Sequence, residues 1–395
     1  MEAAAPIARN RHVLVTSLGI TQIIAWGSSY YLPAVLAAPI AKDTGWSLAS
    51  VVAGLSCGLL LAGLVSPITG RLIQRHGGRP VLAAGSLLLA AAHSLLATAT
   101  AYPLYLVAWL LMGLGMSSSL YDAGFATLGR LYGQAARSAI TNLTLFGGFA
   151  STVCWPLSAF LVEHGGWRVA CLSYAAIHLA ICLPLHLWII PPPPPAAPAP
   201  VRGKSREAYA TGGTRARFIL LASILTVAAM IASTLSVHLL TLLQLRGLGL
   251  AAAVGLGGLV GPSQVGARVA ELLIGRNRHH PIWTMLASVS LLAAGIWLLL
   301  VGHAFIALAL ILYGAGNGIH TIARGALPLV LFDPQQYAVL MGKLATPSLI
   351  IQAAAPSIGA LLLGMGGGNL VLTTLALAAT LNVGLSICLL AAMGR

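Results

Sequence analysis

Long apolar runs alternate along the chain with short segments that carry charges or contain proline and glycine. About 20 apolar residues are needed for a helix to cross the hydrocarbon core of a bilayer. Runs of this length recur twelve times, so the pattern predicts an all-α membrane protein with twelve transmembrane helices. We expect the helices near residues 13–40, 48–70, 80–99, 103–129, 138–162, 168–190, 217–243, 250–272, 282–301, 304–331, 340–364 and 369–391.

The composition leads to the same class. Of the 395 residues, 58% are hydrophobic and only 7% are charged, whereas soluble domains carry about 25% charged residues. This excludes a soluble globular protein, and the apolar content excludes a disordered one. The 5 cysteines all fall inside apolar runs at irregular spacing, so they predict neither a disulfide framework nor a metal site.

The cations are distributed unevenly between the two sides of the predicted membrane. There are 21 Lys and Arg against 7 Asp and Glu, a formal net charge of +14. With a cytoplasmic N-terminus, 18 of the 21 cations fall in cytoplasmic segments or at cytoplasmic helix ends, leaving only Lys42, Arg168 and Arg246 outside. This positive-inside bias predicts a multi-pass protein of a plasma membrane of the bacterial inner-membrane type, with both termini cytoplasmic. The basic excess is then an orientation signal and does not indicate a nucleic-acid partner.

The chain divides into two halves. Residues 191–216 begin with PPPPPAAPAP and continue as a basic stretch. Because polyproline forms a stiff, solvated spacer, we interpret this segment as a cytoplasmic linker. It separates an N-terminal six-helix half, residues 1–190, from a C-terminal six-helix half, residues 217–395.

The two halves repeat one another at an offset of about 200 residues. Gly113 and Gly115 match Gly314 and Gly316, Gly124 matches Gly325, Pro156 matches Pro356, and GLVSP at 63–67 matches GLVGP at 258–262. A duplicated six-helix unit predicts a binding site between the halves, near the bilayer midplane, and rocking between inward-open and outward-open states.

The loop GRLIQRHGGRPVL at 70–82 carries a family resemblance. Together with the twelve spans, the 6+6 halves and the linker, it resembles the major facilitator superfamily, whose signature between helices 2 and 3 is matched by Gly70, Leu72, Arg75, Gly77 and Arg79. Gln74 stands where the family usually has Asp, so the charge-relay gating role of that acid does not carry over. TGWS at 44–47 and GPSQVGAR at 261–268 look like the monocarboxylate-porter branch.

Charges inside membrane helices are costly and indicate function. Asp122 lies in the predicted fourth helix and Arg324 at nearly the equivalent place in the tenth. The family resemblance implies that both helices line a central cavity, where Asp122 would carry a proton and Arg324 would hold an anion. The alternative is that the two form a structural ion pair at the cytoplasmic gate.

Other polar residues within the spans extend the candidate pathway. Arg268 and Glu271 are spaced to pair along the eighth helix, and the alternative for them is substrate contact. The remaining candidates share positions on polar helix faces and are Gln22, Trp26, Tyr30, Ser119, His238, Asn317 and His320.

These patterns predict a transporter and not an enzyme. The chain has no phosphate-binding loop and no metal-ligand spacing, so we expect neither a catalytic residue nor a cofactor. We expect a secondary active transporter, a proton-coupled symporter by alternating access, that moves a small organic anion such as a monocarboxylate. Export of drugs or of metalloids such as arsenite is the alternative, and a non-transporting membrane receptor is a further one.

Overall fold

The computed structural model describes residues 11–192, 212–275 and 279–393. Within these ranges the chain forms helices and no β-strand, which confirms the predicted all-α fold. Most of the expected linker, residues 193–211, lies outside the described residues.

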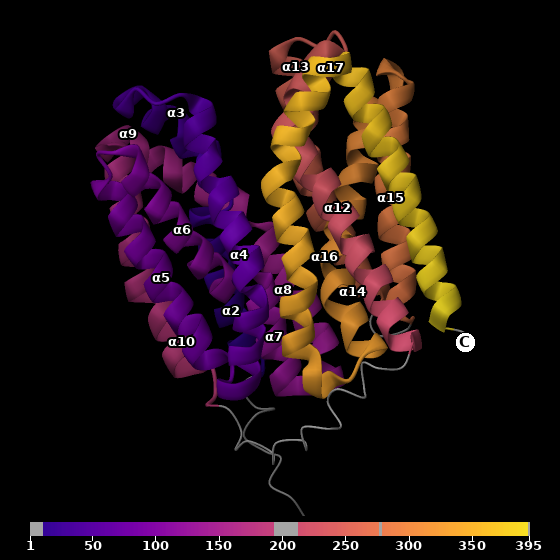
Figure 1. Cartoon of the computed structure of the whole chain (residues 1–395), viewed down its shortest axis with the longest axis horizontal. Coiled ribbons are helices and arrows are strands. Elements are labelled where there is room, and N and C mark those ends of the chain that lie inside the picture. Colours follow the sequence, from indigo (N-terminus) through magenta and orange to yellow (C-terminus); the bar gives the residue numbers. More distant parts are fainter. Residues whose placement is uncertain (1–10, 193–211, 276–278, 394–395) are drawn as a thin grey trace, which may run out of the picture. The chain divides into compact units, whose positions relative to one another are not determined.

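Within each half the helices follow one another with short connections (Figure 1). In the N-terminal half they are α2 (Arg11–Ser28), α3 (Pro33–Thr44), α4 (Leu48–His76), α5 (Gly78–Thr98), α6 (Tyr102–Ser119), α7 (Tyr121–Tyr132), α8 (Ala136–Gly148), α9 (Ala150–Ile177), the π-helical turn η2 (His178–Cys182) and α10 (Leu183–Ile189). In the C-terminal half they are α12 (Gly212–Leu245), α13 (Leu250–Gly257), α14 (Val260–Gly275), α15 (Pro281–Val301), α16 (Ile306–Leu331) and α17 (Tyr337–Met393).

Eight helical segments of the described chain are long and apolar enough to cross a membrane. Two of them contain more than one crossing, because Tyr102–Ile189 has 88 residues and Pro334–Met393 has 60, whereas a single crossing takes about 20. The chain reverses within them at glycines of positive φ, namely Gly133, Gly166 and Gly367. With α13 and α14 as one further broken helix, the predicted twelve spans are recovered.

Several predicted helices are broken where continuous ones were expected. The first, near 13–40, is interrupted between Ser28 and Pro33, and the eighth, near 250–272, between Gly257 and Val260. The fourth, near 103–129, is interrupted at Leu120, whose backbone is extended. The length of the apolar runs does not report these breaks, because each run continues on both sides of its break.

Contacts divide the chain into two compact units. The first comprises Met1–Pro195 with Pro334–Thr346, and the second comprises Ala196–Asp333 with Pro347–Arg395. The beginning of α17 therefore packs with residues of the N-terminal half. The boundaries expected from the sequence, at 190 and 217, stay a prediction.

Matching glycines make matching contacts inside the two units. In the first, Gly113 of α6 packs on the backbone of Gly58 in α4, and Gly115 packs on Leu89 in α5. In the second, the glycines of α16 at the repeat offset, Gly314 and Gly316, pack on Val260 of α14 and Leu292 of α15. The same positions thus bring the same pair of neighbouring helices close in each unit.

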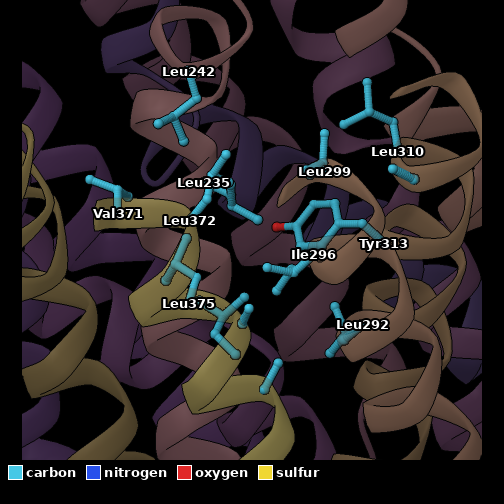
Figure 2. Close-up of a cluster of buried hydrophobic side chains, with 14 of the residues drawn as sticks. Leu235, Leu242, Leu292, Ile296, Leu299, Leu310, Tyr313, Val371, Leu372 and Leu375 are labelled. Atoms are coloured by element: carbon cyan, nitrogen blue, oxygen red, sulfur yellow. The ribbon is translucent and has the colours of Figure 1, made fainter. Parts of the chain in front are cut away.

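The core of the second unit is a cluster of aliphatic side chains around one tyrosine (Figure 2). Tyr313 of α16 is 4% exposed and lies among Ile296 and Leu299 of α15. Leucines from α12 and α17 complete the cluster, including Leu235, Leu242, Leu372 and Leu375. This packing holds α12, α15, α16 and α17 together.

An apolar stripe is exposed along α4. Leu60, Leu64, Ile68 and Leu72 recur every four residues and are 42–55% exposed, so they share one helix face. On the opposite face Gly58, Ala62 and Ser66 are buried. Such a face suits lipid and would be a liability in water.

Candidate functional site

The break in the first helix places aromatic residues in a turn. Pro33 begins α3 and has no N–H, so the carbonyl of Ser29 lacks its usual helical donor. It accepts instead from the backbone N–H of Leu32 at 3.2 Å. The resulting turn contains Tyr30 and Tyr31.

Five aromatic rings meet around this turn. The ring of Trp26 lies 5.4 Å from that of Tyr30, 6.1 Å from that of Tyr31 and 5.1 Å from that of Tyr121. Trp155 of α9 adds a contact to Tyr31 at 6.2 Å. We call these five residues the aromatic cluster. Sequence reasoning proposed Trp26 and Tyr30 as site residues and missed Tyr121 and Trp155, because nothing local indicates which aromatic residues of other helices approach the turn.

Gln22 and Ser119, predicted separately on the first and fourth helices, are in contact. The amide of Gln22 donates to the backbone carbonyl of Ser119 at 2.5 Å, directly before the break at Leu120. The indole of Trp26 donates to the Gln22 side-chain oxygen at 3.2 Å. Gln22 is fully buried, so it joins the break in the fourth helix to the aromatic cluster.

Asp122 lies just after that break. The continuous fourth helix expected near 103–129 is wrong at this point, because α6 ends at Ser119 and Asp122 falls in the first turn of α7. A carboxylate there is stabilised by the N–H groups of the helix start and by the helix dipole. The break therefore changes the surroundings of Asp122 from a helix middle to a helix N-terminus.

A small cavity in the first unit has Asp122 in its lining. Its lining includes Ser66 and Thr69 of α4, Ser117 of α6 and Gly342 of α17. The space inside it that a water molecule can occupy is about 10 Å³, far below the ~300 Å³ at which ligand pockets begin. The cavity suits water and protons better than an organic solute.

The residues of the loop motif are held against neighbouring helices. Gly70 packs on the backbone of Ala338 at the start of α17. The backbone carbonyl of Gln74 accepts from the Arg130 guanidinium. Gly77 joins α4 to α5 at φ 80° and ψ 171°, a conformation that strongly favours glycine. Arg75 is exposed and Arg79 half-buried.

The predicted pairing of Arg268 with Glu271 is wrong. Arg268 is 4% exposed, and its Nε donates to the backbone carbonyl of Gly318 at 3.1 Å. Glu271 accepts from the Thr284 hydroxyl at 2.8 Å and lies 3.2 Å from His279 Nε2. The two residues therefore join α14 to different neighbours.

The polar face predicted on α16 is present in the second unit. His320 is 7% exposed and lies 3.1 Å from the Ser288 hydroxyl of α15. Arg324 follows one turn later on the same helix, and both it and Asn317 are half-buried. Asp122 belongs to the first unit and Arg324 to the second, so their approach stays a prediction.

His238 contacts the backbone of α17. Its Nε2 lies 2.8 Å from the carbonyl of Pro356, and its ring packs against Gly359. This contact is a helix-to-helix hydrogen bond within the second unit.

Three buried histidines were not predicted from the sequence as site residues. His93, His178 and His186 lie inside apolar runs of the N-terminal half and are 0–2% exposed. The signal was available, because any ionisable residue within a membrane span is a candidate for function. Within the ranges that the structure describes, His, Cys, Asp and Glu side chains do not gather in a group of three able to hold a metal ion.

The sequence matches one protein family and part of one known transporter. The profile described as Major Facilitator Superfamily matches residues 18–342. Monocarboxylate transporter 3 of Rattus norvegicus is 33% identical over 144 residues, which are 36% of this chain and 27% of that protein. The match thus spans about a quarter of the relative's length.

Solved structures resemble the whole described fold. The human organic anion transporter MFSD10 (TETRAN) superposes with a TM-score of 0.75 at 18% identity, covering 96% of this chain and 99% of that one. The fucose:proton symporter FucP of E. coli superposes with a TM-score of 0.71 at 14% identity, covering 98% of each chain. At these identities the likeness concerns the fold.

Proposed function

The chain belongs to the major facilitator superfamily, and from this premise we propose that it is a secondary active transporter that moves a small organic anion, such as a monocarboxylate, together with protons. It is a multi-pass membrane protein and a transporter, not an enzyme. The partial match to a monocarboxylate transporter and the fold of an organic anion transporter support an anionic substrate.

The charge of the second unit carries the proposal. Arg268 and Arg324 lie within apolar helices, buried and half-buried respectively. The acid on the same helix as Arg268, Glu271, is engaged by Thr284 and His279. Arginine stays charged and can bind a carboxylate through two parallel hydrogen bonds. An excess of fixed cations in such helices favours an anionic substrate.

Arg324 is the residue that we assign to the anion. Arg268 already donates to the Gly318 carbonyl, so it connects α14 to the backbone of α16. Arg324 follows His320 on the polar face of the same helix.

Asp122 is the residue that we assign to the proton. It lies among apolar helices and lines a small cavity together with hydroxyl groups from α4 and α6. A carboxyl group in these surroundings can bind and release a proton during a transport cycle.

The experiment is substrate-driven proton flux in proteoliposomes with an internal pH dye. Small monocarboxylates, arsenite and amphipathic drugs are added one at a time. A pH change with monocarboxylates alone, lost in Arg324→Gln and kept in Arg71→Gln, supports the proposal, since Arg71 is an exposed cation at the end of α4. Monocarboxylate uptake without a pH change would overturn the proton coupling.

The second candidate is export of drugs or metalloids. The aromatic cluster favours it, since a group of aromatic rings suits an apolar or cationic guest. The thiol of Cys154, which could bind a thiophilic metalloid, offers less support, because its sulfur packs against Gly27 of α2. A pH change with arsenite or drugs alone would put this candidate first. Binding without flux would favour a receptor.

We also propose that both termini lie in the cytoplasm of a bacterial-type inner membrane. The distribution of the 21 cations supports this orientation. Reporter fusions after residue 395 and in the 191–216 segment should both report the cytoplasmic side. A periplasmic signal from either would overturn the orientation.

A further inference from the structure

Two of the buried histidines form a pair that the transport proposal does not use. His93 lies in α5 and His178 begins the π-helical turn η2. Their ring centroids are 5.8 Å apart, with the rings tilted by 33°. π-helical turns inside α-helices are rare and frequently mark functional sites.

Both ring nitrogens of His93 face carbonyl oxygens. Nδ1 lies 2.7 Å from the carbonyl of Leu89, and Nε2 lies 2.8 Å from the carbonyl of Ser28. A carbonyl oxygen only accepts hydrogen bonds, and a neutral imidazole has one N–H and one lone pair. The neutral ring would therefore set its lone pair against one of the two oxygens. Only the doubly protonated ring satisfies both contacts.

The contact to Ser28 is made at the break in the first helix. Ser28 is the last residue of α2, and in a continuous helix its carbonyl would accept from Leu32 N–H. That N–H instead donates to Ser29. The His93 ring supplies the missing donor. His178 Nε2 lies 2.9 Å from the Ser28 hydroxyl, so the pair holds both the backbone and the side chain of Ser28.

We propose that His93 and His178 form a proton-binding site, with the proton on His93 in this conformation, and that release of the proton frees the break in the first helix. Trp26 and Tyr30 lie on either side of Ser28, so the aromatic cluster would move with it. This proposal extends the proposed proton coupling. Proton binding by the two histidines does not depend on that coupling, but a role of the site in transport does.

The neighbours of the pair assign the proton to His93. Two positively charged rings this close would repel each other. The pair therefore binds one proton in addition to the single N–H that each neutral ring carries. His178 Nδ1 is buried and has no hydrogen-bond partner among the described residues, so a proton there would be unpaired. The other titratable groups near the pair are His186, whose positive charge would disfavour a charge on His178, and Tyr174 of α9, whose ring centroid lies 5.7 Å from that of His93. Its hydroxyl is engaged with Ser158 and Cys154.

His186 provides the matched control. It is equally buried, but its ring nitrogens lie 2.9 Å from the Ser86 hydroxyl and 3.1 Å from the Thr21 hydroxyl. Hydroxyls donate as well as accept, so the neutral ring satisfies both contacts. Burial penalises a charge on either ring, and only His93 has two carbonyls to offset it.

The test uses the full-length protein in lipid bilayers with ¹⁵N-labelled histidine rings, observed by solid-state NMR from about pH 5 to about pH 9, the range around the ordinary titration of histidine. The resonances lost in His93→Gln should be those of a doubly protonated ring at the acidic end. The resonances lost in His186→Gln should be those of a neutral tautomer throughout. A neutral His93 ring across the range would overturn the proposal.

A second measurement follows the break in the first helix. It remains possible even if the His93→Gln variant does not fold. With fluorinated tryptophan, the Trp26 resonance, assigned by its loss in Trp26→Phe, should shift at the pH where a histidine ring loses its second proton. The shift should persist in His186→Gln. A Trp26 signal independent of pH would overturn the link to the first helix. Neither readout needs a substrate, so failure of the anion proposal would leave both interpretable.

Discussion

The hydroxyl of Ser233 donates to the backbone carbonyl of Gln352 at 2.9 Å, linking α12 to α17. Pro356 stands four residues after Gln352 and has no N–H, so the helix cannot supply this donor. The same device occurs in the first unit. The Thr346 hydroxyl donates at 2.9 Å to the carbonyl of Gly63, four residues before Pro67. In both units a hydroxyl from a neighbouring helix thus donates to the carbonyl that lacks a helical donor because of a proline. Such a donor is needed because lipid offers no hydrogen bonds to an unpaired carbonyl.

Ser233→Ala should lower the stability of the second unit by about 0.6 kcal/mol, the average for interhelical hydrogen bonds in a membrane protein, and by no more than about 1.7 kcal/mol, the largest value. In a Pro356→Ala background, where the helix supplies its own donor, the same substitution should cost little. Unfolding in mixed micelles measures both. Ser236→Ala is the control, since that exposed hydroxyl bonds within its own helix. Equal losses in both backgrounds would contradict the assignment.

Gly113→Ala and Gly314→Ala should each destabilise the protein by about 1 to 3 kcal/mol, the usual cost of overpacking. An added methyl group would meet the backbone of Gly58 in one unit and of Val260 in the other. Gly266→Ala is the control, because a methyl group there meets nothing within 4 Å. Comparable losses at the two repeat positions, measured by thermal unfolding, would support the common packing. A loss at only one position would argue against it.

Asp122→Asn should abolish accumulation of substrate driven by a proton gradient while leaving exchange of labelled for unlabelled substrate. The amide keeps the size of the side chain but cannot release a proton. Counterflow and gradient-driven uptake in the same vesicles separate the two. Asp43→Asn serves as the comparison, since Asp43 is paired with Arg168 at the end of α3. Accumulation that survives in Asp122→Asn would make this acid structural.

Arg324→Gln should weaken binding of the anion by about 10- to 100-fold, because hydrogen bonds to charged groups contribute roughly 1.5 to 3 kcal/mol. Arg324→Lys should recover only part of the affinity, since an ammonium cannot make two parallel hydrogen bonds. Substrate-dependent thermal shifts give the affinities. Unchanged binding in Arg324→Gln would remove this residue from the site.

Arg268→Gln should behave differently and lower stability more than affinity. The guanidinium is buried and donates to the carbonyl of Gly318, where α14 and α16 cross closely. The expected loss is about 1 to 3 kcal/mol, the cost of leaving a buried group without its partner. Unfolding in the absence of substrate measures it. A stable variant that has lost anion binding would place Arg268 in the site instead.

The sequence by itself determined the class of fold, the twelve spans and the repeat. Bilayer thickness sets the length of every apolar run, and the signal is local, so each run can be read without its neighbours. The loop motif could also be predicted from the sequence, because the turn at Gly77 needs a positive φ that favours glycine locally. The site residues Gln22, Ser119 and Trp26 were also found as polar or aromatic positions inside apolar runs.

Only the tertiary structure decided which of these residues meet. Gln22 bonds the Ser119 carbonyl, which lies directly before the break of the fourth helix at Leu120. Arg268 bonds Gly318 and not Glu271 because the glycines of α16 let α14 approach its backbone. The pair of His93 with His178 depends on where the first helix breaks against α5 and η2. Partners of this kind are set by helix crossings between distant segments, and hydrophobic periodicity along one segment carries no record of them.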